Sequence, residues 1–571
     1  MNEVDRSVAG YVARFLRARG VDRVFALCGG HIMPLWMAID AAGIAIVDVR
    51  DERAAVYMAH AYGELRDGFG VALVTAGPGV TNAITGIANA HVARAPVLVL
   101  SGVPPQPQEG RGALQDLPHV ELVRPLTRDA RTLREPALVP AALDEAVARA
   151  LGEGGEPGPV YIDFPTDTLL ASLPPAVELA EYLAPQRRPG PAPHEAAVRA
   201  AVDLLWSARR PLVISGRGAR RTGAPLAALL DRLGAVYLDT GESRGVIPDD
   251  HPAVVAAMRG TVIGEADVVL TVGRRLDFQL AYGSPAVFGN ARFVRIADTP
   301  GELRDNRRGV VEILADCGDA LTAIVAAAGA RLPATDREWA RGLRRRHVER
   351  AAKLDASMRN AADDAEGRMH PNRLLAALQE RIGTDAIVVA DGGDLLSFAR
   401  IGIHAATWLD PGPLGCIGIG TSFGTGAALA CPGRTVCVVT GDGAFGFNAM
   451  EIDTAVRHRV PLLVVVANNG AWQIEVDDQT RRFGRVTGTR LQFADHAAMA
   501  RAFGMHAERV TRADDLGAAI DRALANRPAL LDVVVSPSAA SSDARSGLAR
   551  VPDLQALDAW DDAERRWRAS R

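Results

Sequence analysis

The chain has 571 residues, more than a single hydrophobic core usually holds, so we expect two to four domains. Hydrophobic residues make up 48% and charged residues 23% of the chain, a composition that indicates a globular α/β protein and excludes disordered and fibrous classes. The net charge of −4 gives no electrostatic reason to expect nucleic acid or a membrane surface as a partner.

No apolar run approaches the length of a membrane span. Residues 1–19 carry charges and lack an uninterrupted apolar core, so they do not predict a signal peptide. The five cysteines show no metal-ligand spacing, which predicts free thiols and a cytoplasmic location. Lys353 is the only lysine. This disfavours Schiff-base chemistry and a lysine-containing phosphate loop.

The first third of the chain alternates short apolar runs with helical segments. After a helix near the amino terminus, the expected strands are residues 24–27, 44–49, 71–75, 97–100 and 157–165. Strands that alternate with helices predict a parallel sheet covered on both faces.

Polar side chains follow several of these strands. Glu52 comes after the second strand and opens a helix, His31 lies in the turn after the first strand, and Gln115 lies in the glycine-flanked loop 110–116. Ligands of open α/β sheets bind outside the carboxyl ends of the strands, so these three residues are candidates for a site. Alternatively, an acid at Glu52 only complements the helix dipole, and His31 is an ordinary loop side chain.

The middle third predicts a second α/β domain. A proline-rich linker at residues 174–193 precedes expected strands at 211–215, 235–238, 267–272 and 293–296. Arginines that follow these strands form a solvated basic rim or, alternatively, bind the phosphates of coenzyme A or ADP. They are Arg217, Arg220, Arg221, Arg274 and Arg275.

The last third begins with a charged helical connector at residues 337–364 and a strand at 386–390 that leads into the turn 391–394. A serine-, alanine- and arginine-rich stretch at 536–550 follows the last expected strand, and residues 554–567 predict an amphipathic helix. This tail is either a lid over a site or a segment that packs against another subunit.

Two motifs close neighbouring apolar runs in this last domain. Asp442, in a Gly-Asp-Gly turn, follows residues 436–439, and Asn469, twenty-seven positions later, follows 462–466. Such runs predict buried parallel strands, whose carboxyl ends lie side by side. A carboxylate, an amide oxygen and a backbone carbonyl near Ala471 suit Mg²⁺ with water ligands. Gly443 lacks a Cβ, so a diphosphate could approach the amides at the start of the next helix, including that of Ala444.

A Gly-Asp-Gly followed about thirty residues later by Asn-Asn resembles the signature of thiamine diphosphate enzymes. The resemblance implies thiamine diphosphate and Mg²⁺ as cofactors, and three doubly wound parallel-sheet α/β domains with a tail. The implied segments are an aminopyrimidine-binding domain at 1–172, a central domain at 190–335, a diphosphate- and magnesium-binding domain at 368–537 and a tail at 538–571.

The same resemblance implies roles for further residues. Glu52 bonds N1′ of the aminopyrimidine, so that the 4′-amino group can take the proton from C2 of the thiazolium ring. The segment 415–418 resembles one in which a backbone carbonyl, here of Gly415, accepts from the 4′-amino group, while an apolar side chain, here Ile417, holds the cofactor bent. The turn with Gly393 and Asp394 approaches the diphosphate.

Resemblance also guides the choice of reaction. The His31 context is similar to benzaldehyde lyase, and the loop at Gln115 is similar to acetolactate synthases and 2-hydroxyacyl-CoA lyases. Glu475 lies in a segment similar to pyruvate-type decarboxylases and is a candidate proton donor or acceptor. The adjacent histidine pair of those decarboxylases is missing, which disfavours a simple 2-keto acid decarboxylase.

Along most of its length the chain resembles 2-hydroxyacyl-CoA lyases and oxalyl-CoA decarboxylases. This implies cleavage of a small-molecule acyl-CoA to formyl-CoA and an aldehyde or ketone, in a homodimer or homotetramer. The alternatives are a carboligase of the acetolactate synthase type, often with FAD in the central domain, or of the benzaldehyde lyase type. A cofactor-binding relative without turnover is the alternative outside enzymes.

Overall fold

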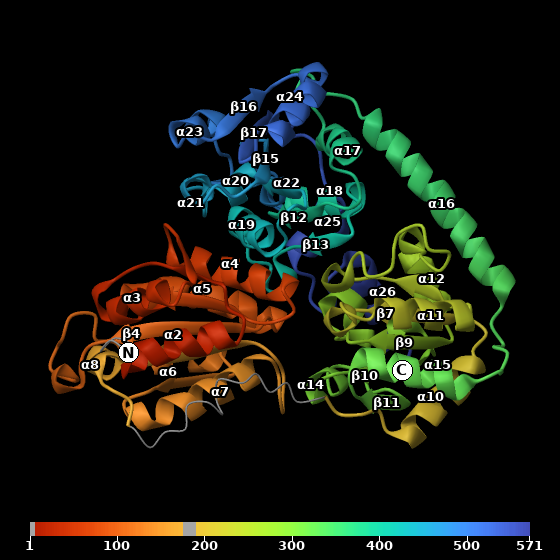
Figure 1. The fold of residues 1–571 in the computed structure, drawn as a ribbon. Coiled ribbons are helices and arrows are strands. Elements are labelled where there is room, and N and C mark those ends of the chain that lie inside the picture. The colour runs from red at the N-terminus through yellow and green to blue at the C-terminus, as the bar shows by residue number, and fades with distance from the viewer. Residues whose placement is uncertain (1–5, 175–189) are drawn as a thin grey trace.

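The computed structural model describes residues 6–174 and 190–571, and most of the expected linker 174–193 lies outside these residues. Within them, the strands form three parallel sheets of six, five and six strands. Figure 1 shows each sheet with its helices as a separate lobe, and the three lobes pack around a common centre. The expected α/β fold with three doubly wound domains is confirmed.

The first sheet has the strand order β2-β1-β3-β4-β6-β5. Its strands are β1 (Arg23–Ala26), β2 (Ala45–Asp48), β3 (Gly70–Val74), β4 (Val97–Val103), β5 (Asp129–Thr132) and β6 (Pro159–Pro165). Val71 and Leu73 pack in one apolar cluster while Ala72 and Val74 pack in another. Successive side chains of a strand point to opposite faces, so β3 is buried on both sides of the sheet.

Helices cover both faces of this sheet. They include α2 (Val8–Ala18), α3 (Met33–Ala41), α4 (Glu52–Leu65), α5 (Pro78–Ala93), α6 (His119–Val123), α7 (Val139–Ala150) and α8 (Thr166–Leu170). The helix α4 also packs on α19 (Gly420–Ala430) of the third domain, so the first and third lobes share a helix pair.

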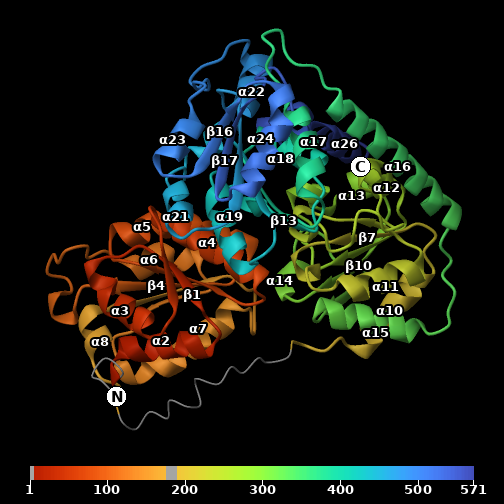
Figure 2. The same cartoon turned by 45° about the horizontal axis from the view of Figure 1, so that its top comes forward.

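The central sheet has the order β11-β10-β9-β7-β8. Its strands are β7 (Pro211–Ser215), β8 (Val236–Leu238), β9 (Val268–Val272), β10 (Arg292–Ala297) and β11 (Val311–Leu314), and its helices include α10 (Glu195–Trp206), α11 (Gly223–Leu233), α12 (Arg259–Glu265), α13 (Pro285–Phe288), α14 (Pro300–Leu303) and α15 (Cys317–Ala328). The helix α16 (Arg337–Arg359) then runs along the outside of the molecule to the third lobe (Figures 1 and 2), and it buries Leu343 and Met358.

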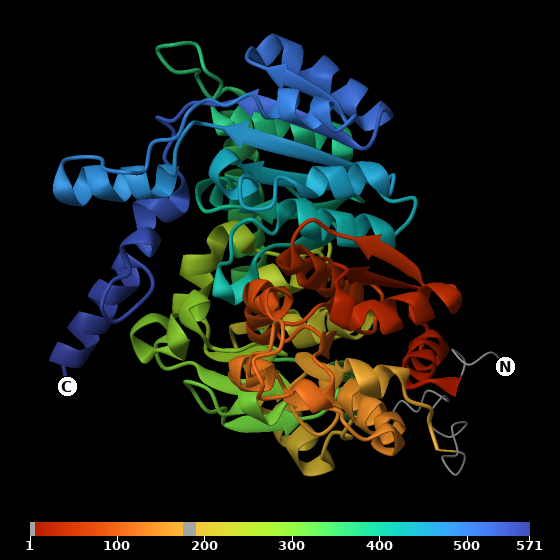
Figure 3. The ribbon, with the colours of Figure 1, turned by 90° about the vertical axis from the view of Figure 1, so that its left-hand side faces the viewer.

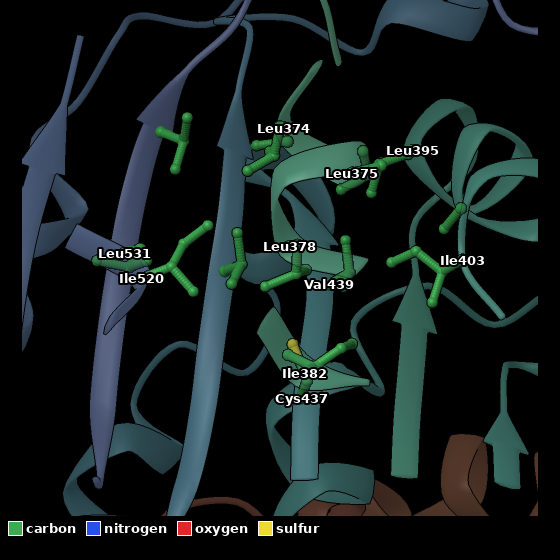
Figure 4. Close-up of a cluster of buried hydrophobic side chains, with 14 of the residues drawn as sticks. Leu374, Leu375, Leu378, Ile382, Leu395, Ile403, Cys437, Val439, Ile520 and Leu531 are labelled. Atoms are coloured by element: carbon green, nitrogen blue, oxygen red, sulfur yellow. The ribbon is translucent and has the colours of Figure 1, made fainter. Parts of the chain in front are cut away.

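The third sheet has the order β13-β12-β14-β15-β17-β16. Its strands are β12 (Ile387–Asp391), β13 (Thr407–Leu409), β14 (Val436–Gly441), β15 (Leu462–Asn468), β16 (His506–Val510) and β17 (Ala529–Val534). Its helices include α17 (Pro371–Ile382), α18 (Asp394–Gly402), α19, α20 (Asp442–Phe445), α21 (Glu451–Arg457), α22 (Gln473–Phe483), α23 (His496–Ala502) and α24 (Ala513–Ala525). Figure 4 shows leucines of α17 against Val439 on one face of this sheet, in a cluster that also holds Leu531.

The strand register aligns the turns that carry the candidate residues. Asp391 pairs with Thr440 and Gly441 pairs with Ala467. The turns after β12, β14 and β15 therefore leave the sheet side by side, at the edge where ligands of such sheets bind.

Four short strands were not expected from the sequence. These strands, β5, β11, β13 and β16, each lie at an edge of their sheet. Each is hydrogen-bonded on one side, and it is either polar, as in His-Ala-Glu-Arg-Val of β16, or very short, as in Thr-Trp-Leu of β13. It therefore lacks the continuous apolar run that marks a buried strand.

The tail continues from β17 into α25 (Ser542–Ser546) and α26 (Asp558–Ala569), and α26 packs on α13 of the central domain. Figure 3 shows α22 and α26 on the same flank of the molecule, away from the amino terminus. Among residues 6–174 and 190–571, no helix has both the length and the apolar character needed to cross a membrane.

Candidate cofactor site

Asp442 and Asn469 lie side by side, because β14 and β15 are neighbours in register. The Asp442 side chain is 5% exposed. Burial raises the pKa of its carboxyl to about 6, while the backbone amides of Gly443, Asn469 and Gly470 oppose this rise. The carboxylate therefore faces the backbone of the Asn-Asn turn.

A cation would fit between these turns. Oδ2 of Asp442 is buried and has no hydrogen-bond partner within the described part of the chain. Oδ1 of Asn469 accepts from the amide of Ala471 at 3.2 Å, which curls the turn. No cluster of three or more histidine, cysteine, aspartate or glutamate side chains that could hold a metal occurs among the described residues. One carboxylate with amide and backbone oxygens is a donor set that suits Mg²⁺ with water ligands.

The two asparagines have different roles, which the sequence motif does not reveal. Asn468 is 0% exposed. Its Nδ2 donates to Oδ1 of Asp532 and to the carbonyl of Ala494, each at 2.9 Å. Asn468 thus anchors the turn on the neighbouring strand β17 and leaves Asn469 to face Asp442.

Gly443 also makes room for a neighbouring ring, a role that the sequence did not predict. A Cβ at this position would lie 2.6 Å from the ring of Trp472. The ring of Trp472 also packs edge-on against Phe447, with 6.1 Å between centroids. The missing side chain therefore makes room for an indole ring from the Asn-Asn turn, which ties that turn to the start of α20 and to Ala444.

Asp391 connects the turns around the site, and its role was not predicted. Its Oδ1 accepts from the amides of Gly392 at 2.7 Å and Gly418 at 3.0 Å. Its Oδ2 accepts from the amide of Gly420 at 2.9 Å and the hydroxyl of Thr440 at 3.3 Å. Burial raises the pKa of this carboxyl while the three amides oppose the rise. One buried carboxylate thus fixes the ends of β12 and β14 and the segment 415–418.

The segment 415–418 is also held by α4. The hydroxyl of Tyr57 lies 2.9 Å from Sγ of Cys416, and Tyr57 follows Glu52 by five residues on α4. Gly415 has a φ of +68° and Gly418 has a φ of +89°, a conformation that favours glycine. Ile417 is half-buried. The expected wedge thus lies on a tightly constrained loop.

The turn with Gly393 and Asp394 lies between β12 and the tail. A Cβ on Gly393 would be 3.2 Å from Ile474, so this turn touches the segment that follows the Asn-Asn motif. Asp394 is 9% exposed. Burial raises the pKa of its carboxyl to about 6, and the side chain of Ser541 opposes this rise. The tail therefore reaches the turn that was expected to approach a diphosphate.

Glu52 lies in the first turn of α4 and is 6% exposed. Its Oε2 accepts from Nδ2 of Asn82 at 3.0 Å, and its Oε1 lies 3.5 Å from the position of a Cβ on Gly79. Asn82 was not predicted. Its position on α5, one turn after Gly-Pro-Gly, offered the only signal.

His31 and Gln115 lie at the same edge of the first sheet, at the ends of β1 and β4. Gln115 has a φ of +64°. A Cβ added to Gly77 would lie 2.7 Å from the Cβ of Gln115, so the two residues pack closely. The amide of Gly77 donates to Nε2 of the buried His119 at 2.7 Å. Burial lowers the pKa of His119, which keeps the imidazole neutral and able to accept. His119, which was not predicted, thus holds the turn against which Gln115 packs.

Glu475 lies in the first turn of α22, and its side chain is exposed. The neighbouring Gln473 is 4% exposed and donates to Asp477 at 2.9 Å. Ile474 contacts Gly393. The buried part of this segment is therefore Gln473 and Ile474, while a proton-transfer role for Glu475 stays a prediction.

The prediction of a solvated basic rim on the central domain is wrong for Arg274 and Arg217, which bind carboxylates. Arg274 is 1% exposed, and it donates to Glu242 at 2.9 Å and to Asp277 at 2.8 Å. Arg217 donates to both oxygens of Asp298 at 2.8 Å. These guanidinium groups are buried because carboxylates of the same domain neutralise them.

The other arginines join the central domain to the first domain. Arg220 pairs with Glu64 at 2.7 Å, Arg221 pairs with Asp67, and Arg275 pairs with Glu156. The buried Arg94, which was not predicted, pairs with Glu302 in the same contact. Phosphate binding by these side chains would require them to give up existing partners.

Comparisons with known proteins agree with this geometry. Three models of the thiamine pyrophosphate enzymes match the chain: the N-terminal TPP binding domain at residues 6–122, the central domain at 198–324 and the C-terminal TPP binding domain at 395–533. The first and last matches contain Glu52 and the Asp442–Asn469 pair, respectively.

Relatives of full length are similar to the chain. A 2-hydroxyacyl-CoA lyase 2 of Caenorhabditis elegans is 32% identical over 92% of this chain and 89% of its own length. A probable acetolactate synthase of Mycobacterium bovis is 35% identical over 93% of this chain and 96% of its own length. A 2-hydroxyacyl-CoA lyase 1 of Mus musculus is 30% identical over 94% and 95%. On these matches and the site geometry, the chain belongs to the thiamine pyrophosphate enzymes.

Proposed function

We propose that this protein is a thiamine diphosphate- and Mg²⁺-dependent carbon–carbon lyase that cleaves a 2-hydroxyacyl-CoA to formyl-CoA and an aldehyde or ketone. The ends of two sheets support an enzyme: Glu52 opens α4 after β2, and Asp442 and Asn469 follow the neighbouring strands β14 and β15. Similarity to proteins named 2-hydroxyacyl-CoA lyase supports the substrate class.

The position of the tail is the observation that favours a CoA thioester over a free keto acid as the substrate. The amide of Asp543 donates to Oγ of Ser397 at 3.1 Å, and Arg481 of α22 donates to the carbonyl of Ala544 at 2.6 Å. The tail thus adds a wall beside the Asp394 turn and the segment after the Asn-Asn motif. A free keto acid needs no such wall, whereas the long arm of coenzyme A extends well beyond the reacting carbons.

A cavity of about 390 Å³ opens beside the same segment. His370 and Arg545 line it together with Ser536, Ser538 and Asp364, whose carboxylate is paired with Arg368 at 2.8 Å. Its volume lies in the range of small-molecule sites. Arg545 donates to two backbone carbonyls of its own helix start, at 3.4 and 2.5 Å, and its positive charge at the cavity would favour the phosphates of coenzyme A.

Residues of the third sheet would hold the cofactor. Asp442, Asn469 and the carbonyl of Ala471 would bind Mg²⁺, and the turn with Gly393 and the amides at Gly443 would bind the diphosphate. When bound, thiamine diphosphate supplies a thiazolium carbon that attacks a carbonyl and stores the electron pair of a breaking carbon–carbon bond. The protein contributes binding, orientation and proton transfer.

Residues of the first sheet would handle protons. Glu52 would hold a proton at N1′ of the aminopyrimidine, with Asn82 keeping its carboxyl in place. His31 and Gln115 would orient the 2-hydroxyl group of the substrate, and the imidazole of His31 would take its proton as the C1–C2 bond breaks. A proton returned to the former thioester carbon gives formyl-CoA, so substrate and products balance without an oxidant.

An acetolactate synthase-type carboligase is the second candidate, because a probable acetolactate synthase is 35% identical to this chain. The ion pairs of the central domain weigh against a flavin there, since Arg274 and Arg217 already bind carboxylates. A benzaldehyde lyase-type reaction rests on the His31 context alone. A relative without turnover is disfavoured because Glu52 and the Asp442–Asn469 pair are all present.

We further infer that the active protein is a homodimer or homotetramer. Exposed apolar side chains gather near the His31 and Gln115 turns, where a second copy would cover them. They are Met33, Met37, Leu114, Leu117 and Leu122. An ADP or coenzyme A nucleotide at the central domain would have to displace the carboxylates that the arginines there already bind.

Product analysis tests the function. Protein reconstituted with thiamine diphosphate and Mg²⁺ is offered a short 2-hydroxyacyl-CoA, such as 2-hydroxyisobutyryl-CoA, beside pyruvate and benzoin. We expect formyl-CoA with a ketone or aldehyde, and no product from the variant Glu52→Gln. Acetolactate or benzaldehyde as the main product would refute the lyase proposal and leave the cofactor assignment standing.

A further inference from the structure

The helix α21 of the third domain packs on the turn of the first domain that leads into Glu52. Glu451 begins α21 and is 1% exposed. Its Oε1 accepts from the amide of Arg50 at 3.0 Å, and its Oε2 accepts from the hydroxyl of Thr454 at 2.7 Å. Arg50 and Asp51 join β2 to α4, so this carboxylate holds the backbone just before Glu52.

Other charged pairs of the same contact are more exposed. Arg50 lies 3.3 Å from Asp453, with side chains 50% and 17% exposed. Arg457 lies 2.5 Å from Asp48, with side chains 34% and 45% exposed. Water screens such pairs, and each contributes little. Glu451 differs because it is buried and binds backbone, which fixes a turn more firmly than an ion pair between flexible side chains.

We propose that Glu451 is a positioning residue for Glu52, which it holds in place through the Arg50–Asp51 turn in its ionised form and less firmly when protonated. The inference rests on the proposed function, because the role of Glu52 at the cofactor comes from there. Glu52 is then held twice, by Asn82 at its carboxyl group and by Glu451 at the amide of Arg50 in the preceding turn.

Burial raises the pKa of Glu451 to about 7, and the nearby carboxylate of Asp51 adds to this rise, while the amides of Arg50 and Asp51 oppose it. Arg53 pairs with Asp51, and His458 in the same contact pairs with Asp48. Above pH 7 the carboxylate accepts as an anion, in bonds about twice as strong as those of a neutral acceptor. The hold on the turn therefore changes near neutral pH.

Hydrogen–deuterium exchange at C2 of bound thiamine diphosphate tests this role, because it reports on Glu52 without any substrate. Holoprotein with Mg²⁺ is quenched in acid, and the C2 proton is followed by NMR between pH 5.5 and about 8.5. We expect Glu451→Gln to exchange about tenfold more slowly above pH 7 and to lose the pH step that Glu451 contributes.

Two further variants make the test specific. Asp453→Asn breaks the neighbouring ion pair of Arg50 and should leave the pH step unchanged. Thr454→Val removes the hydroxyl donor at a position that is 0% exposed, and should move the step to higher pH. This variant also keeps the test open if Glu451→Gln does not fold.

The outcomes separate this inference from the proposed function. If the wild-type holoprotein shows no enhanced C2 exchange, the proposed function fails and the role of Glu451 fails with it. If the wild type exchanges and the folded Glu451→Gln and Thr454→Val variants keep its pH profile, only the positioning role is refuted.

Discussion

Replacing Asp391 by asparagine should weaken cofactor binding without unfolding the protein. The carboxylate accepts from three backbone amides and one hydroxyl. An asparagine keeps one acceptor oxygen and places an amide group opposite Gly420 and Thr440. The threonine hydroxyl can rotate and accept, so the main loss is one charged hydrogen bond and one unsatisfied amide, about 1–3 kcal/mol.

Part of this loss is offset, because the neutral asparagine avoids the cost of burying a charge, the same cost that raises the pKa of Asp391. If the turns around the site are less well ordered by a net free energy of about 1.4 kcal/mol, thiamine diphosphate should bind about tenfold more weakly. Tryptophan fluorescence titration with the cofactor and Mg²⁺ measures this. Asp385→Asn is the matched control, since Asp385 precedes the same strand with a side chain 96% exposed. Equal affinity of a folded Asp391→Asn variant and the control would refute the role of Asp391.

Three further predictions concern single side chains. Glu52→Gln should slow C2 exchange of the cofactor by a factor of about 10²–10⁴ while calorimetry finds its affinity nearly unchanged; normal exchange would contradict this role. Burial raises the pKa of Glu451 from 4.5 to about 7, so the folded protein favours the protonated acid: the contribution of Glu451 to the free energy of unfolding is complete below pH 4.5 and is lost as the pH rises through 7. The cost of burying the charge outweighs the stronger hydrogen bond that the ionised carboxylate makes to the Arg50 amide. Glu451→Gln should therefore gain up to about 3 kcal/mol over the wild type between pH 5 and 8, measured as urea midpoints; a gain independent of pH would count against this. Arg274→Met should destabilise the central domain by about 3–5 kcal/mol, because it removes a buried guanidinium that binds the carboxylates of Glu242 and Asp277. Arg221→Gln, at a side chain 54% exposed, should cost about 0–1 kcal/mol, and similar melting temperatures for the two variants would refute the distinction.

The sequence predicts the interior of the fold better than its margins. Strands such as β7 and β15 are buried on both faces and appear as continuous apolar runs, which a sequence reveals directly. The edge strands β5 and β16 are polar and the edge strands β11 and β13 are very short, so their pairing depends on neighbours far along the chain. The residues of an edge strand alone do not identify the strand with which it pairs.

The candidate site shows the same division. The apolar runs before Asp442 and Asn469 predict that both residues follow neighbouring strands, and β14 and β15 are neighbours. The anchoring roles of Asn468, Asp391 and Glu451 arise from contacts across strands and domains, as in the bond from Arg50 to Glu451 over 401 positions. Such contacts form only when the sheets and domains pack together, so no local sequence pattern predicts these anchoring roles.

The arginines of the central domain illustrate a limit of residue type as a guide. A run of arginines after parallel strands suggests phosphate binding, but Arg274 and Arg217 bind Glu242 and Asp298 instead. The acids lie on other turns of the same sheet. Only their placement in space distinguishes an internal ion pair from an anion site.

The most direct test of the account follows the fate of the former thioester carbon. A short 2-hydroxyacyl-CoA is incubated in D₂O with the protein, thiamine diphosphate and Mg²⁺, and the products are analysed by mass spectrometry and NMR. The account predicts formyl-CoA with deuterium at the formyl carbon, because the incoming proton comes from groups that exchange with solvent. An intact acyl-CoA here, with acetolactate formed in a parallel incubation with pyruvate, would contradict it.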